Sequence, residues 1–123
     1  MSTAVPVNLE IESGTDWKVG FNLRDEFGRY LDLGSNENGS HVVTAQMARN
    51  YTSTTKYDLN AEIIQPNEGA VQLSLSRSDT TSLKAGRYLW NIFLTDPDGV
   101  KSKVIEGVIT VIPGVLWADI KLP

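Results

Sequence analysis

Apolar and polar residues alternate along most of this chain, and this period of two is the feature that most constrains its fold. The pattern recurs in seven segments, at 7–12, 17–23, 43–47, 57–63, 71–75, 88–94 and 105–111. Such alternation is typical of strands that bury one face and expose the other. Turn-forming residues separate the segments at a spacing of about ten residues. The sequence therefore predicts an all-β fold, an antiparallel β-sandwich of seven or eight strands.

The domain organisation follows from the length of 123 residues, which suits one domain with one hydrophobic core. We expect the sandwich to occupy residues 1–112 and to be followed by an apolar C-terminal tail at 113–123. One short helical turn is predicted near 78–84, where Ser78 is placed to cap it and Gly86 to end it.

Tyr88 follows this turn and refines the fold prediction. In Ig-like domains a tyrosine near the start of strand F returns its hydroxyl to the backbone, two residues before a core cysteine. This chain has no cysteine, and the corresponding position is Trp90. We therefore expect an Ig-like sandwich in which the indole of Trp90 fills the volume of the missing disulfide.

Two expected hairpins share the pattern Leu-x-Asp-x-x-Gly, at 23–28 and 94–99. The aspartate of such a turn accepts hydrogen bonds from backbone amides, and the glycine adopts a left-handed conformation. The carboxylates Asp96 and Asp98, with Asp25 and Glu26 in the first copy, are also the candidates for a calcium site. Calcium needs about six to eight oxygen ligands, and each turn offers two carboxylates. We interpret them as turn acceptors and expect no metal and no cofactor.

His41, the one histidine of the chain, is the candidate catalytic base. Catalysis through it needs an activated nucleophile, and the nearby Ser35 and Ser40 lie in a loop rich in glycine and asparagine. The sequence leaves open a pair of carboxylates that would act in glycoside hydrolysis. The sequence predicts a protein that is not an enzyme and has no small-molecule substrate.

The charge distribution indicates which classes of binding partner to expect. The net charge is −4, and lysine and arginine are scattered singly, so we expect no nucleic-acid partner. The N-terminal residues have neither a charged start nor a long apolar run, so we expect no signal peptide and no membrane partner.

The tryptophans divide into two groups. Trp17 and Trp90 lie on the apolar faces of their strands, which predicts core packing; a sugar-stacking platform would need them exposed and coplanar. Trp117 lies beyond the last strand, after Pro113 and Gly114. The suspected interface residues of this tail are Val115, Leu116, Trp117, Ile120 and Leu122. The tail either folds back over its own sandwich or docks on another subunit, and we favour docking.

Four stretches carry a resemblance to a known family. They are SGTDWKVGFNLRDEFGRYLDL, TAQMARNYTSTTKYDL, SRSDTTSLKAGRYLWNIFLTDPDG and EGVITV, within Leu9 to Val111. In their order and spacing they resemble small virion structural proteins of tailed bacteriophages, and are similar in style to the N-terminal Ig-like domain of baseplate upper proteins. The resemblance implies a non-enzymatic protein without catalytic residues to carry over.

These observations lead to one expected function and its alternatives. We expect an accessory structural protein of a phage virion, either a baseplate or tail component or a capsid decoration. It would be made in the host cytoplasm and attached to other virion proteins, in multiple copies, through strand edges and terminal segments. The alternative is a carbohydrate-binding module, a frequent function of β-sandwiches. A hydrolase is the weaker third option.

Overall fold

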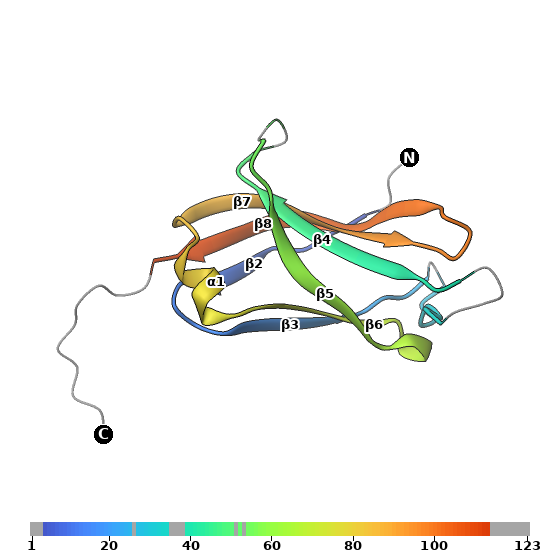
Figure 1. Cartoon of the computed structure of the whole chain (residues 1–123). Helices are drawn as coiled ribbons and strands as arrows, with labels where there is room; N and C mark the ends of the chain where they lie inside the picture. The colour runs from blue at the N-terminus through green and yellow to red at the C-terminus, as the bar shows by residue number, and fades with distance from the viewer. Residues whose placement is uncertain (1–3, 26, 35–38, 51, 53, 114–123) are drawn as a thin grey trace, which may run out of the picture.

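Strands make up most of the computed structural model, which describes residues 4–25, 27–34, 39–50, 52 and 54–113 (Figure 1). The strands are β1 (Val5–Pro6), β2 (Leu9–Glu12), β3 (Trp17–Asn22), β4 (Val42–Ala48), β5 (Tyr57–Gln65), β6 (Ala70–Leu75), β7 (Gly86–Thr95) and β8 (Lys101–Ile112). One helix, α1 (Arg77–Thr81), and one 3-10 turn, η1 (Pro66–Glu68), complete the described elements. The all-β prediction is confirmed.

The strands form two layers joined through β5. Their order is β1-β8-β7-β4-β5-β6-β3, and β2 also pairs with β8. The first part of β5 pairs with β4, and its second part pairs with β6, so β5 crosses from one layer to the other (Figure 1). An Ig sandwich places strands C, F and G in one sheet and B, E and D in the other. Here β4, β7 and β8 take the first set of places, and β3, β6 and β5 take the second.

The N-terminal strands differ from the antiparallel pattern that we predicted. Both β1 and β2 run parallel to β8, with Val5 opposite Ile105 and Leu9 opposite Ile109. Alternation could not reveal this, because side chains alternate between faces in parallel and antiparallel strands alike. The parallel pairing covers the outer edge of β8, which would otherwise present unpaired backbone groups.

The core consists of the inward residues of the alternating segments. On β4, β6 and β7 every second residue is buried: Val43, Ala45, Met47, Val71, Leu73, Leu75, Tyr88, Trp90 and Ile92. The corresponding residues of β3 are only half-buried. The predicted core faces are therefore confirmed in the centre of the sandwich and incomplete along β3.

Tyr88 and Trp90 occupy the places expected of them. The Tyr88 hydroxyl donates to the Lys84 carbonyl over 2.7 Å, which forms the predicted corner. Trp90 is 2% exposed, stacks on Phe21 with ring centroids 6.0 Å apart, and donates its indole N–H to the Val7 carbonyl over 2.9 Å. The indole thus fills the centre of the core and also binds the N-terminal segment.

The helical turn is one place where the sequence prediction was wrong in detail. Ser76, not Ser78, caps α1: its hydroxyl accepts from the Asp79 amide over 3.2 Å, and the Asp79 carboxylate accepts from the Ser76 amide over 3.4 Å. This reciprocal capping box satisfies two backbone donors. The helix ends at Thr81 with Ser82 as its C-cap, and Gly86, the residue predicted to end it, is instead the first residue of β7.

Replacing Tyr88 with phenylalanine tests the corner. The change leaves the Lys84 carbonyl without its donor, so we expect the free energy of unfolding to fall by about 1 kcal/mol. Tyr57→Phe is the matched control, because the Tyr57 ring packs edge-on against Tyr88 at 5.8 Å and its hydroxyl has no hydrogen-bond partner within the described chain. Urea denaturation measures both variants, and equal losses would contradict the role assigned to the corner.

Candidate functional site

The sandwich is open along the side where its two outermost strands face each other. Within the described sheet, β3 pairs only with β6, and β2 pairs only with β8. Near α1 the two edges are held together, because the Trp17 indole donates to the Glu10 carbonyl over 3.0 Å. Toward the other end the two layers separate (Figure 1). An opening between β1 and the end of β3 is the result.

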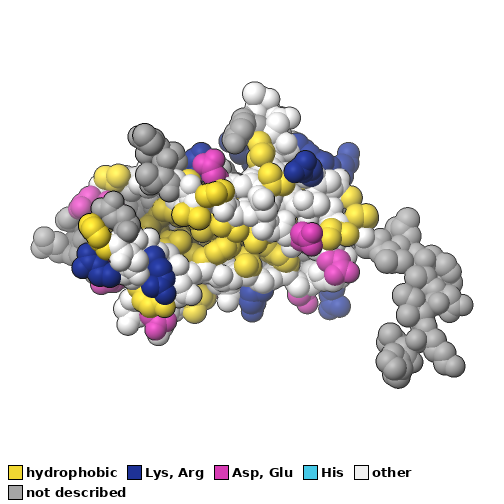
Figure 2. Space-filling model, turned by 180° about the vertical axis from the view of Figure 1, so that it is seen from behind, with side chains coloured by type: hydrophobic (Ala, Val, Ile, Leu, Met, Phe, Trp, Pro, Cys, Tyr) yellow, Lys and Arg dark blue, Asp and Glu magenta, His cyan; other side chains and the backbone are white. Residues whose placement is uncertain are grey.

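This opening is an apolar groove with a volume of about 610 Å³. Its walls come from β1, the end of β3, the turn after β3 and the start of β8. Its apolar lining residues are Val5, Val7, Phe21, Leu23, Leu31, Val104 and Ile105. Figure 2, which views the molecule from behind, shows hydrophobic side chains gathered along a hollow in this face. The volume lies within the range of about 300–1,000 Å³ that is usual for ligand pockets.

Exposed apolar side chains surround the same end of the sandwich. Val5 is 57% exposed, Phe27 in the turn after β3 is 74% exposed, and Val100 in the β7–β8 turn is 60% exposed. Tyr30, Val42 and Ile64 also lie at strand ends or turns on this side, whereas Ile112 lies at the opposite end. A gathering of exposed apolar groups on one surface marks a site of protein–protein contact. We call this surface, together with the groove, the apolar end.

Three charged residues also line the groove. Arg24 and Asp25 lie beside it on one wall, and Lys103 lies on the other. The Arg24 guanidinium stacks on the Tyr30 ring at 4.1 Å from the centroid, and the Arg29 side chain pairs with Asp25 over 3.4 Å. These contacts engage Arg24 and Asp25 with neighbours in their own turn. The arrangement fits an apolar segment of a partner with polar flanks.

Both Leu-x-Asp-x-x-Gly turns have the same geometry. The Asp25 carboxylate accepts from the amides of Phe27 and Arg29 over 2.9 and 3.0 Å. The Asp96 carboxylate accepts from the amides of Asp98 and Val100 over 3.0 and 2.8 Å. In each turn the glycine that ends the motif has a positive φ, 82° at Gly28 and 88° at Gly99. The interpretation as turn acceptors is confirmed for Asp25 and Asp96.

These bonds also explain the electrostatics of the first turn. The hydrogen bond from the Arg29 amide lowers the pKa of Asp25 below its usual value, and the amide of Phe27 and the charge of Arg29 act in the same direction. Within the described residues, no three His, Cys, Asp or Glu side chains lie close enough together to hold a metal ion. Glu26 lies outside the described residues.

The other residues that the sequence offered as candidate site residues do not come together in one site within the described residues. The His41 ring donates from Nδ1 to the Gly34 carbonyl over 2.9 Å, and Ser35 lies outside the described residues. Trp90 is buried and Trp17 is half-buried, so these two do not form an exposed stacking platform. The suspected interface residues lie outside the described residues, so that interface stays a prediction. They are Val115, Leu116, Trp117, Ile120 and Leu122.

The apolar end is not among the sites that the sequence predicts. Alternation placed Phe21 on an inward face, and it gave no sign that this part of the face stays uncovered. The exposed Phe27 between two turn residues was the one local signal, because a large aromatic side chain is unusual at the tip of a hairpin turn.

Comparisons with known proteins assign this chain to no family. No family model matches the chain, and no curated protein sequence matches it. A solved structure of an internalin-like protein from Listeria monocytogenes is similar at 14% sequence identity and a TM-score of 0.41. That match covers 89% of this chain and 28% of the Listeria chain. Within the described residues, no helix is long and apolar enough to cross a membrane.

Proposed function

We propose that this chain is a non-enzymatic assembly domain of a bacteriophage virion, which attaches to neighbouring structural proteins. The observation that carries the proposal is the apolar end, where an open groove and exposed Val5, Phe27 and Val100 lie together. Burial of such groups stabilises protein–protein contacts by roughly 25 cal/mol per Å² of apolar surface. The resemblance in sequence to virion structural proteins supports the particle setting, and the virion is the proposed location.

Two further features support attachment rather than catalysis. The outer edge of β3 has no strand partner within the described residues, and such an edge can add a strand from another protein. The apolar C-terminal residues around Trp117 are the second proposed attachment. In a particle with many copies, each contact can be weak because avidity adds them together. Other virion proteins, in multiple copies, are therefore the proposed partners.

The proposal is tested by co-expression with the proteins encoded next to this chain's gene. We expect the wild-type protein to co-elute with a capsid, tail or baseplate protein in size-exclusion chromatography. Val5→Asp should weaken that binding at least about tenfold, because the new carboxylate loses water in an apolar groove. The fold should tolerate this change, since Val5 is 57% exposed.

Ile112→Asp is the matched control, because Ile112 is an exposed aliphatic residue at the opposite end of the sandwich. It should bind as the wild type does. A variant that lacks residues 113–123 tests the second attachment separately. If no particle protein co-elutes with the wild type, the proposed function is wrong; if Val5→Asp binds like the wild type, the apolar end is not the contact.

A further inference from the structure

The outward face of the sheet formed by β5, β4, β7 and β8 carries a row of polar side chains. Asp58 lies opposite Gln46, Gln46 lies opposite Asn91, and Asn91 lies opposite Glu106, so each strand contributes one residue to the row. Cross-strand partners share a face of the sheet, so these four side chains form a line across the strands. The Gln46 amide donates to the Asp58 carboxylate over 3.1 Å.

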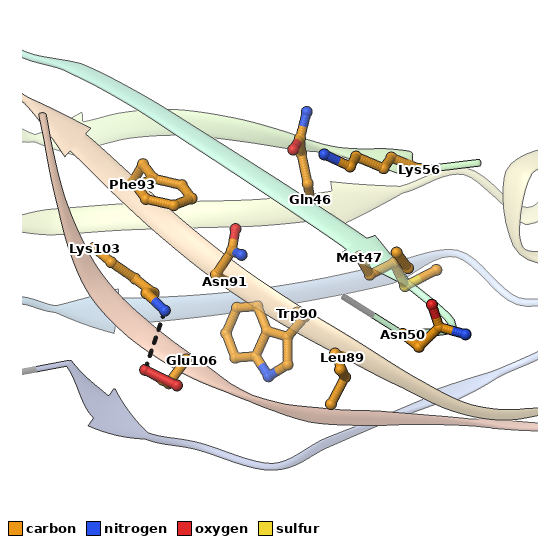
Figure 3. Close-up of a pocket in the computed structure, with 11 residues that line it drawn as sticks. Gln46, Met47, Asn50, Lys56, Leu89, Trp90, Asn91, Phe93, Lys103 and Glu106 are labelled. Atoms are coloured by element: carbon orange, nitrogen blue, oxygen red, sulfur yellow. Dashed lines mark ion pairs between the residues drawn. The ribbon is translucent and has the colours of Figure 1, made fainter. Parts of the chain in front are cut away.

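Two hollows lie side by side on this face. The first has a volume of about 190 Å³ and includes Asn91, Lys56 and Glu106 in its lining (Figure 3). The second has a volume of about 320 Å³ and includes Asp58 and Lys101. Gln46 and Phe93 line both hollows, so the two adjoin at these side chains. The face therefore has two adjoining hollows, each of which could receive one small ring of a ligand.

One polar atom beside the first hollow, the side-chain oxygen of Asn91, lacks a hydrogen-bond partner within the described residues. The Asn91 side-chain oxygen is buried and has no hydrogen-bond partner within the described residues. A buried acceptor in this state costs about 1–3 kcal/mol, and such groups call for an explanation. Figure 3 shows the Asn91 amide among the side chains of Phe93, Gln46 and Trp90, which line the same hollow. A turn of the amide toward the hollow would bring this oxygen within reach of a ligand's donor.

The charges on this face set the class of ligand. Lys103 pairs with Glu106 over 3.4 Å, whereas Lys56 and Lys101 form no ion pair within the described chain. Lys56 lines the first hollow and Lys101 lines the second, where its ammonium lies 4.8 Å from the Phe93 ring centroid. Each hollow therefore has one ammonium available for an anion, on a protein whose net charge is −4.

We propose that this face binds an acidic oligosaccharide. A sugar ring packs on the half-buried Phe93, and its hydroxyls bond to Gln46 and to the unpartnered Asn91 oxygen. Amide side chains both donate and accept, as vicinal hydroxyls require, and an aromatic ring offers a flat apolar surface to the C–H face of a sugar. The carboxylate of an acidic sugar pairs with Lys56 or Lys101. Trp17 lines neither hollow, and Trp90 borders the first hollow but is only 2% exposed, so its ring offers no stacking surface.

This site is separate from the apolar end and does not depend on the proposed assembly function. Gln46, Asn91 and Phe93 point outward from the sheet and do not line the groove. Lys103 lines both places, so the test leaves it unchanged.

The test is an NMR titration of the full chain with three acidic probes: a hyaluronan tetrasaccharide, an alginate trisaccharide and 3′-sialyllactose. Cellotetraose and lactose are the neutral counterparts. We expect at least one acidic probe to shift the side-chain amide signals of Gln46 and Asn91 and the ring signals of Phe93. Added salt should weaken this binding, because the ammonium–carboxylate pairs are exposed.

Variants assign the charges and the ring. Lys56→Gln and Lys101→Gln should each weaken binding roughly two- to fivefold, as expected for exposed ion pairs. The matched controls are Lys18→Gln and Lys84→Gln, exposed lysines elsewhere on the sandwich, which should leave the affinity unchanged. Phe93→Leu should weaken the acidic and the neutral sugars alike.

Three outcomes would overturn the proposal. The first is that no acidic probe shifts the signals of Gln46, Asn91 or Phe93 at concentrations up to the solubility of the sugar. The second is that cellotetraose or lactose binds as tightly as the acidic probes. The third is that the control lysines weaken binding as much as Lys56 and Lys101 do.

Discussion

Replacing Trp90 with alanine is expected to lower the free energy of unfolding by about 3–5 kcal/mol, the range for large aromatic residues in protein cores. Trp90 is 2% exposed, so the truncation leaves a cavity that the surrounding strands cannot fully close. The Val7 carbonyl also loses its indole donor. Since domains of this size are stable by only about 5–15 kcal/mol, a large part of the total is lost. Urea denaturation followed by far-UV circular dichroism measures the change.

The same substitution should affect the groove. The Trp90 ring stacks on Phe21 and its indole holds Val7, and these two residues line opposite walls of the groove. Trp90→Phe is the informative partner variant, because it keeps a stacking ring and removes the donor. We expect it to cost about 1–2 kcal/mol. A loss below about 1 kcal/mol for Trp90→Ala would contradict the central place given to this side chain.

Features encoded by a few neighbouring residues could be predicted from the sequence. Both aspartate turns depend on residues within one short motif, and the Tyr88 corner reaches back only to Lys84. The capping residue of α1 could also have been predicted correctly. Ser76 and Asp79 have the spacing of a capping box, whereas Ser78 has no acidic residue or glutamine three positions later.

Features that depend on distant pairing could not be predicted in the same way. The parallel pairing of β1 and β2 with β8 joins residues about a hundred positions apart, as Val5 and Ile105 are, and no local pattern specifies which edge a strand will join. The groove follows from that choice, because it is the gap left between β1 and β3. Phe21 has the pattern of a core residue, and only the missing cover makes it part of a binding surface.

The polar row on the outward face has the same origin. Gln46, Asn91 and Glu106 are ordinary solvent-facing residues in their own strands, and nothing near them in the sequence relates one to another. The register of β4 against β7 and of β7 against β8 brings them into line. A one-residue shift in either register would send half of the row to the opposite face. Candidate sites of this kind therefore emerge only from the assembled sheet.

Replacing Gly107 with alanine is expected to detach the N-terminal segment from β8. Gly107 lies opposite Trp90 on β7, and a Cβ atom at this position would overlap the Val7 carbonyl oxygen and lie 2.8 Å from its carbon. Both are backbone atoms, so no side-chain rotation can relieve the clash. The segment must move away, which breaks the bonds from the Val7 amide to the Glu106 carbonyl and from the Trp90 indole to Val7.

We expect Gly107→Ala to cost about 3 kcal/mol, the upper part of the range for overpacked sites. The Val7 amide should also lose its protection from hydrogen exchange, because its acceptor on Glu106 moves out of reach. Binding at the apolar end should fall with it, since Val5 and Val7 form one wall of the groove.

Gly20→Ala is the matched control, because it adds the same methyl group to a strand glycine that has room for it. A Cβ atom there would lie 3.7 Å from the nearest neighbour, the Val71 carbonyl, which is an ordinary contact. Alanine at this position should leave the stability unchanged or raise it by about 0.5 kcal/mol, since the unfolded chain loses conformational freedom. The two alanine variants are compared by the urea concentration at which each unfolds. If these concentrations are equal, the N-terminal segment does not pack closely on Gly107, and that packing does not position the β1 wall of the groove.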